Sequence, residues 1–184
     1  MLLTHTHILA LIDQGVIEDA DPSRVNAASL DVTLGDSLYL EDLDSIRPVD
    51  LAAKQAPGFR KIPCYQDSDG PYWCLSPGFF ALASTREIFH LPNDLAIEYK
   101  LKSSLARAGL GHLLAGWGDP GWHGSNLTLE LVNHLQSHDL LLRPGMPIGQ
   151  IVFWRGETVP DHASYAARGQ YNRDLGATPS KGIR

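Results

Sequence analysis

The stretch Leu127-Thr-Leu-Glu-Leu-Val-Asn133 decides the fold that the sequence predicts. Its leucines at 127, 129 and 131 alternate with Thr128, Glu130 and Val132, so successive side chains point to opposite sides. This period of two is typical of a β-strand with one buried face. We therefore expect the leucines to lie in a core and Glu130 to lie on the opposite face of the strand.

Apolar runs before and after this stretch also have the sequence features of β-strands. They alternate with polar residues or are rich in strand-forming residues, and turns that contain Gly or Pro separate them. The predicted strands cover residues 29–34, 79–84, 95–101 and 148–154. One helix is predicted over residues 6–14, where apolar residues recur at helical spacing before Gly15. The chain is therefore predicted to be all-β, a sandwich or barrel with a short N-terminal helix.

Length and composition limit the size of the fold and the classes of partner. The 184 residues suit one domain, expected over residues 1–162, followed by a tail over 163–184 that lacks apolar periodicity. The formal net charge of −6 disfavours binding to nucleic acid or to anionic membranes. No apolar run approaches the ~20 residues that cross a bilayer, and the N-terminus does not resemble a signal peptide. We expect a cytoplasmic protein with no membrane partner.

Residues 102–107, Lys-Ser-Ser-Leu-Ala-Arg, form the first candidate binding motif. Ser103 can cap a short helical turn that Gly109 can end. The free amides at the start of such a turn can bind a phosphate, with Lys102 and Arg107 adding positive charge. On spacing alone, a connecting turn with solvated basic residues explains the motif equally well.

Three other positions also leave a structural and a functional interpretation open. Asp119 begins an Asp-Pro-Gly turn, and Trp122 after it can fill the core or offer a stacking surface. A lone glutamate such as Glu130 on an alternating strand is usually solvated. In a cleft, however, the same carboxylate can accept and return protons.

Histidine and cysteine patterns do not indicate a metal site. His5 with His7, and His134 with His138, are close in sequence, but neither pair belongs to an HExxH motif. The sequence also lacks the H-x-E and P-C-x-x-C signature of zinc nucleobase deaminases, and two cysteines alone cannot make a four-ligand site. The sequence therefore predicts no zinc, and we expect most of the histidines at the surface.

Six short motifs occur in an order and spacing that resemble the dCTP deaminases of the dUTPase-like superfamily. They are ASLDVTLG (28–35), LSPGFFALA (75–83), KSSLARAGL (102–110), DPGW (119–122), TLELVN (128–133) and RPGMPIGQ (143–150). The resemblance implies a distorted β-barrel or jelly-roll and a homotrimer with active sites between subunits. It also implies hydrolytic deamination of dCTP to dUTP and ammonia, with Mg²⁺ bound through the triphosphate.

The resemblance also implies roles for individual residues. Glu130 resembles the general base and proton shuttle. Ser103 and the Ala115 carbonyl resemble the groups that hold the attacking water, and Arg107 resembles the cation that supports them. Asp119 resembles the aspartate that activates the hydrolytic water in dUTPases. The substrate-binding positions implied in the same way are Lys102, Ser104, Asp119, Trp122, Gln150, Tyr171, Arg168 and Lys181.

Three departures from the family pattern bear on the substrate contacts and on the product. Lys102 stands where many relatives have arginine. The tail, expected to close over the triphosphate as a lid, lacks the lysine and glutamine of the usual Lys-Tyr-x-x-Gln pattern at 170–174. Arg168, Arg173 and Lys181 are candidate replacements. Gly116-Trp117 is closer to bifunctional members that release dUMP and pyrophosphate. Two alternatives therefore remain: a bifunctional dUMP-forming enzyme and a non-catalytic nucleotide-binding β-trimer.

Overall fold

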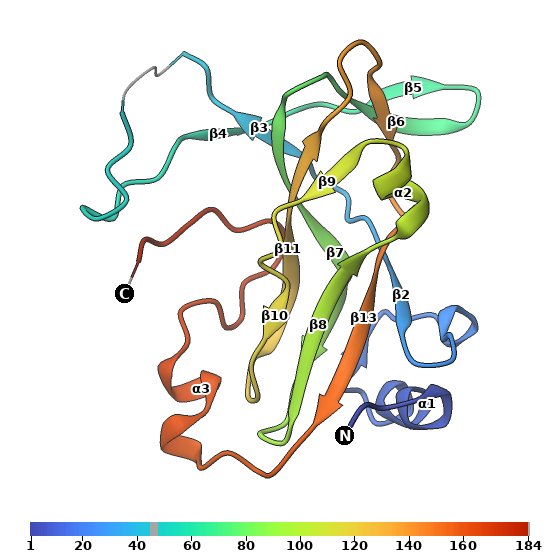
Figure 1. Cartoon of the computed structure of the whole chain (residues 1–184), viewed down its shortest axis with the longest axis vertical. Coiled ribbons are helices and arrows are strands. Elements are labelled where there is room, and N and C mark those ends of the chain that lie inside the picture. The colour runs from blue at the N-terminus through green and yellow to red at the C-terminus, as the bar shows by residue number, and fades with distance from the viewer. Residues whose placement is uncertain (45–47, 184) are drawn as a thin grey trace.

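The predicted central strand lies within β11 (His123–Asn133). In the computed structural model, which describes residues 1–44 and 48–183, β11 pairs antiparallel with β7 (Phe80–His90) on one side and β9 (Leu110–His112) on the other (Figure 1). Leu127, Leu129 and Leu131 are buried, as their alternation predicts. Glu130 therefore lies on the face of the sheet that points away from the core.

The strands form three antiparallel sheets, and each predicted strand is present as a strand or as part of one. The first sheet has the order β4 (Phe59–Lys61), β3 (Tyr39–Glu41), β7, β11 and β9, with β1 (Ile17–Glu18) beside β7. The second has the order β10 (Trp117–Gly118), β8 (Leu95–Leu101), β13 (Pro147–Arg155) and β2 (Leu30–Thr33). The third contains β12 (Leu140–Leu142), β6 (Gly70–Leu75) and β5 (Tyr65–Asp67).

The helices are short and lie outside the sheets (Figure 1). The predicted N-terminal helix is α1 (His5–Asp13), which buries Ile8 and Leu11 and ends before Gly15 at φ +71°. The remaining helices are η1 (Pro22–Arg24), α2 (Ser103–Arg107), η2 (Asp161–Ala163) and α3 (Tyr165–Arg168). Within residues 1–44 and 48–183, no helix has the length and apolar content needed to cross a membrane.

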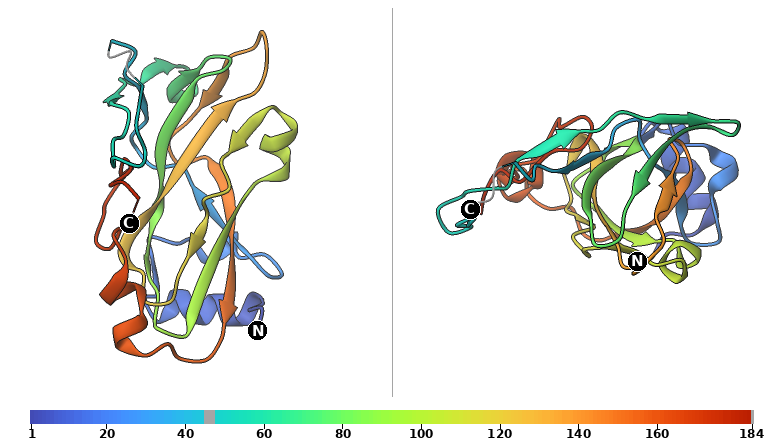
Figure 2. Two further views of the ribbon diagram at one scale, coloured as in Figure 1. Left: turned by 60° about the vertical axis from the view of Figure 1, so that its left-hand side comes forward. Right: turned by 90° about the horizontal axis from the view of Figure 1, so that it is seen from above.

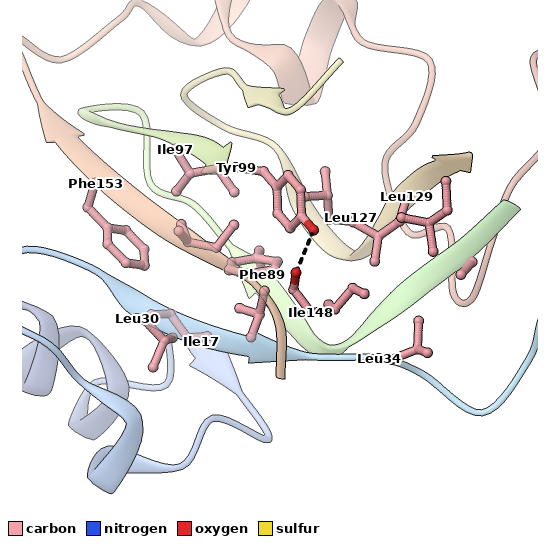
Figure 3. Packing of buried hydrophobic residues seen from close by; sticks show 14 of the residues in the cluster. Ile17, Leu30, Leu34, Phe89, Ile97, Tyr99, Leu127, Leu129, Ile148 and Phe153 are labelled. Atoms are coloured by element: carbon pink, nitrogen blue, oxygen red, sulfur yellow. Dashed lines mark hydrogen bonds between the residues drawn. The ribbon is translucent and has the colours of Figure 1, made fainter. Parts of the chain in front are cut away.

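The two larger sheets curve around one hydrophobic core (Figure 2). Leu129 comes from the first sheet, and Ile148 and Phe153 come from the second, and all three side chains are fully buried. The Tyr99 hydroxyl donates a hydrogen bond to the Ile148 carbonyl over 3.3 Å, so this polar atom is satisfied inside the core (Figure 3). The all-β fold with a short N-terminal helix is thus confirmed.

One carboxylate, that of Glu87 on β7, is buried beside this core. It accepts hydrogen bonds from the Thr33 amide at 3.0 and 3.1 Å and from the Thr33 hydroxyl at 2.8 Å. Burial nevertheless raises the pKa of Glu87, because desolvation outweighs the stabilisation of the charged form by these donors. Glu87 ties β7 of the first sheet to β2 of the second.

Candidate active site

A cavity of about 410 Å³ lies on the outer face of the first sheet, where β11 and β7 run side by side. Glu130 and Thr128 project into it because they alternate with the buried leucines of β11. Most of the remaining wall is apolar and aromatic. It is formed by Pro57, Phe59, Phe80, Leu82, Ala115, Trp117, Gly118, Trp122, Asn126, Leu127, Tyr165, Tyr171, Asp174, Thr178 and Ser180.

Glu130 has a histidine beside it that the sequence analysis did not select. The Nε2 atom of His112 lies 3.1 Å from Glu130 Oε2, and the His112 side chain is only 3% exposed. Strand pairing brings the two together, because β9 places His112 opposite Leu131. The amide of Leu114 donates to His112 Nδ1 over 3.2 Å, which assigns the proton of the neutral ring to Nε2, facing the carboxylate.

The contact between His112 and Glu130 is close but not aligned. Among the residues that the structure describes, neither His112 Nε2 nor Glu130 Oε2 has a hydrogen-bond partner, although both atoms are buried. Buried polar atoms are normally paired, and His112 is the polar neighbour of Oε2. A ligand in the cavity can therefore reach only the part of the Glu130 side chain, 22%, that remains exposed on the cavity wall. The ring of Tyr99 packs on His112 with the ring centroids 4.6 Å apart. Burial and the nearby charge of Glu130 raise the pKa of Tyr99, which stays neutral.

Trp122 packs in the core and also lines the cavity, so the predicted core position is confirmed and the stacking surface for a ligand stays a prediction. Its side chain is buried and stacks on Phe89 with the centroids 5.7 Å apart. The indole Nε1 donates to the Tyr171 carbonyl over 2.7 Å. This bond attaches the C-terminal tail to the cavity wall.

The tail runs along β11 at the edge of the cavity, and its backbone binds β11 side chains. The amide of Gly176 donates to Asn126 Oδ1 over 2.8 Å, and the amide of Thr178 donates to Thr128 Oγ1 over 3.1 Å. In this conformation, Lys181 does not line the cavity.

Lys181 is instead bound within the tail itself. Its Nζ atom lies 2.5 Å from Asp174 Oδ2, donates to the Gln170 carbonyl over 2.9 Å and lies 5.0 Å from the centroid of the Tyr171 ring. The predicted tail cation Arg168 does not line this cavity either. Together with Asp119 it lines a neighbouring cavity of about 330 Å³.

The predicted catalytic residues Ser103 and Arg107 and the predicted phosphate contacts Lys102, Ser104 and Gln150 form a second group, in and beside α2 and on β13. None of Lys102, Ser103, Ser104, Arg107 and Gln150 lines the Glu130 cavity. Ser103, Ser104 and Arg107 are exposed on α2, which ends before Gly109 at φ +89° as predicted. The prediction that Ser103 caps α2 is wrong, because the helix begins at Ser103 itself and the preceding Lys102 makes no side-chain cap.

Polar side chains of neighbouring strands hold this second group in place. Lys102 on the α2 side pairs with Asp31 of β2 at 2.5 Å, and both side chains are largely buried. Asn26 donates to Asp31 over 2.9 Å, and Ser29 donates to Gln150 over 3.4 Å. One chain therefore carries two separate groups of predicted site residues: the cavity group around Glu130, and the α2 group of Lys102, Ser103, Ser104, Arg107 and Gln150.

The described residues offer no cluster of three or more His, Cys, Asp and Glu side chains that could hold a metal ion.

The chain was compared with protein families and with known proteins. A family model described as dCTP deaminase-like matches residues 2–156. A protein of Nocardioides sp. named "dCTP deaminase, dUMP-forming" is 38% identical, over 98% of this chain and 95% of its own length. Proteins with the same name from Acidothermus cellulolyticus and Thermobifida fusca are 37% and 36% identical, each over 98% of this chain and over 95% and 92% of their own lengths.

A solved structure has the same fold. The 2′-deoxycytidine 5′-triphosphate deaminase from Agrobacterium tumefaciens superimposes with a TM-score of 0.63 at 22% identity. The match covers 84% of this chain and 49% of the Agrobacterium chain. The family model and the relatives agree with the six motifs, and the chain belongs to the dCTP deaminase-like family.

Proposed function

We propose that this chain deaminates dCTP and hydrolyses the product to dUMP and pyrophosphate. The observation that carries the proposal is Glu130, a largely buried carboxylate on the wall of a mostly aromatic cavity, with His112 Nε2 3.1 Å from its Oε2. A carboxylate held in this way can accept a proton from water and return it to a base. Aromatic walls suit a planar pyrimidine and keep competing water out.

The first step adds water to C4 of the cytosine. Glu130 accepts the proton of the attacking water and passes it to N3, and a further proton transfer lets the C4–N bond break with release of ammonia. Ser103 and the Ala115 carbonyl hold this water in place, and Arg107 supports them. A carboxylate and fixed hydrogen-bond partners supply this chemistry without zinc, so treatment with a zinc chelator is expected to leave the rate unchanged.

The second step hydrolyses the α-phosphate. Asp119 accepts the proton of a second water, whose oxygen bonds to the α-phosphorus while the bridging P–O bond breaks and pyrophosphate leaves. Support for this step comes from the names of the relatives, which are dUMP-forming. These names favour the alternative product over the dUTP that we first expected as the end product, so dUTP becomes the intermediate.

The complete site needs a second copy of the chain. The α2 group does not line the cavity of its own chain, and the residues of 1–44 and 48–183 that line the cavity include no lysine or arginine to bind a triphosphate. Leu113 and Leu114, next to Ala115, are 55% and 91% exposed, which suits burial against another subunit. We propose a homotrimer in which the α2 group of one chain faces the Glu130 cavity of the next.

The triphosphate enters as its Mg²⁺ complex and is bound by residues from both ends of the chain. Lys102, Ser104 and Gln150 contact the phosphates, and Trp122 lies beside the deoxyribose. Residues 163–184 act as the lid, in which Tyr171, Arg168 and Lys181 are the substrate contacts. Removal of Mg²⁺ is expected to impair turnover because the phosphate charges are then left unneutralised.

Glu130→Gln tests the proposal. The amide keeps the shape of the side chain but cannot accept the proton, so ammonia release from dCTP should fall at least 10²-fold. Binding of dCTP, measured by calorimetry, should remain. Glu157→Gln, which neutralises an exposed glutamate outside the cavity, is the matched control.

Two results would count against the enzyme. Near-normal turnover by Glu130→Gln would remove the carboxylate from the mechanism. Tight dCTP binding by the unmodified chain without any ammonia release would instead favour the non-catalytic nucleotide-binding trimer.

A further inference from the structure

Trp117 is an exposed tryptophan with a specific polar contact. Its side chain is 56% exposed at the edge of the Glu130 cavity, yet its indole Nε1 donates a hydrogen bond to Asp119 Oδ1 over 2.9 Å. Side chains two residues apart in an extended segment point to the same side. The spacing Trp-x-Asp therefore brings the indole and the carboxylate together.

The backbone on both sides of Trp117 is fixed by close packing on β8. A Cβ atom at Gly116 would lie 2.6 Å from Tyr99 Cβ, and one at Gly118 would lie 2.7 Å from Ile97 Cγ1. The Tyr99 amide also donates to the Gly116 carbonyl over 2.7 Å. Since β10 cannot shift without losing this packing, the sheet fixes the backbone from which the indole extends, and the hydrogen bond to Asp119 holds the indole itself.

The Asp119 carboxylate depends on that one donor. It is exposed at the start of a turn, and within the described part of the chain no other side chain hydrogen-bonds it and no cation pairs with it. Without the indole, an exposed aspartate would sample several rotamers. The bond to Trp117 holds Oδ1 and leaves Oδ2 free to accept a proton.

Asp119 also lies where two cavities meet. Trp117 and Gly118 line the Glu130 cavity, Asp119 lines the neighbouring one, and Tyr165 lines both. The charge of Asp119 contributes to the raised pKa of Tyr165, after the larger effect of burial. Asp119 thus lines a cavity that shares the Tyr165 wall with the main cavity, whereas Glu130 lines the main cavity alone.

We propose that Trp117 is a positioning residue that orients Asp119 for hydrolysis of the α-phosphate, and that it contributes less to deamination. This inference rests on the proposed function. In the step concerned, the water oxygen bonds to the α-phosphorus and the water proton goes to Asp119 Oδ2. The bridging P–O bond breaks, and pyrophosphate leaves with the electron pair. A charge-assisted hydrogen bond that fixes the acceptor lowers the cost of reaching this geometry.

The kinetic test separates the two steps. Trp117→Phe keeps the ring and removes the donor, so dUMP formation should fall roughly tenfold while ammonia release falls less. In an Asp119→Asn background, Trp117→Phe should not lower dUMP formation any further. The effects of two substitutions are not additive when one residue acts through the other. Trp154→Phe, on β13 outside both cavities, is the matched control.

A spectroscopic test needs no turnover. In a ¹H–¹⁵N correlation spectrum the four tryptophans give four indole signals, and Trp117→Phe identifies one of them. Asp119→Asn should move that signal and speed its exchange with solvent. An unmoved signal, equal kinetics for Trp117→Phe and Trp154→Phe, or multiplied losses in the double variant would overturn the inference. Ammonia release without dUMP by the unmodified chain would refute the proposed product, whereas a shifted indole signal would still demonstrate the contact.

Discussion

His112 is the polar side chain beside Glu130, with its Nε2 atom 3.1 Å from the carboxylate. His112→Phe keeps an aromatic ring against Tyr99 but removes this polar neighbour. We expect kcat for deamination to fall roughly tenfold, the loss typical of a contact to a charged group, with a smaller change in KM. Steady-state ammonia release measures both values. A change confined to KM would show that His112 serves binding rather than the chemistry of Glu130.

Glu87 affects stability rather than chemistry. Because its pKa is raised in the folded state, the unfolded chain loses this proton at lower pH than the folded chain does. The buried charge therefore lowers the free energy of unfolding by its full amount above the folded-state pKa of Glu87. This destabilisation disappears as pH falls toward the ordinary pKa of glutamate.

The unmodified chain should therefore gain stability relative to Glu87→Gln as pH falls from the folded-state pKa of Glu87 to the ordinary pKa of glutamate. Each unit of raised pKa corresponds to about 1.4 kcal/mol. Urea unfolding of both proteins at a series of pH values measures the difference. A difference that does not vary with pH would mean that Glu87 has the same pKa in both states.

The tail carries its own ion pair, Asp174 with Lys181, in place of the neutral glutamine of the usual family pattern. Asp174→Gln should free Lys181 for the triphosphate. A partly exposed pair contributes about 0.2–1 kcal/mol, so we expect KM for dCTP to fall by a factor of roughly 1.4 to 5. Glu157→Gln serves again as the charge-matched control. Weaker dCTP binding by Asp174→Gln would show that Asp174 itself supports the closed tail.

Local patterns were sufficient to predict β2, β8, β11, β13 and the first half of β7, and the face on which Glu130 lies. The shorter strands β1, β3, β4, β5, β6, β9, β10 and β12 were not predicted. The alternation of leucines in β11 and the Gly109 stop after α2 depend on neighbouring residues only. The contact of His112 with Glu130 depends on the register of β9 against β11, which no local pattern contains. The path of the tail could not be predicted from a local pattern either. Its backbone is held by the side chains of Asn126 and Thr128, and the tail itself has no apolar periodicity.

Most of the predicted site residues fall into the cavity group and the α2 group, while Asp119 and Arg168 line the neighbouring cavity. The proposed site combines the cavity group of one chain with the α2 group of another. Glu130→Gln removes the carboxylate of the cavity group, and Ser104→Ala removes a proposed phosphate-binding hydroxyl of the α2 group. Mixed trimers of the two inactive proteins should regain activity, because roughly a quarter of the shared sites then combine two intact groups. Subunit exchange followed by an ammonia assay measures this gain. Inactive mixtures whose exchange is confirmed by mass spectrometry would place both groups in one chain's site.

The central claim is that this chain converts dCTP to dUMP, and one reaction tests it. The unmodified protein is incubated with dCTP and Mg²⁺, and ammonia, dUTP, dUMP and pyrophosphate are quantified over time. We predict equal amounts of ammonia, dUMP and pyrophosphate, with little free dUTP. Accumulation of dUTP without pyrophosphate would contradict the second step, and the absence of ammonia would contradict the whole account.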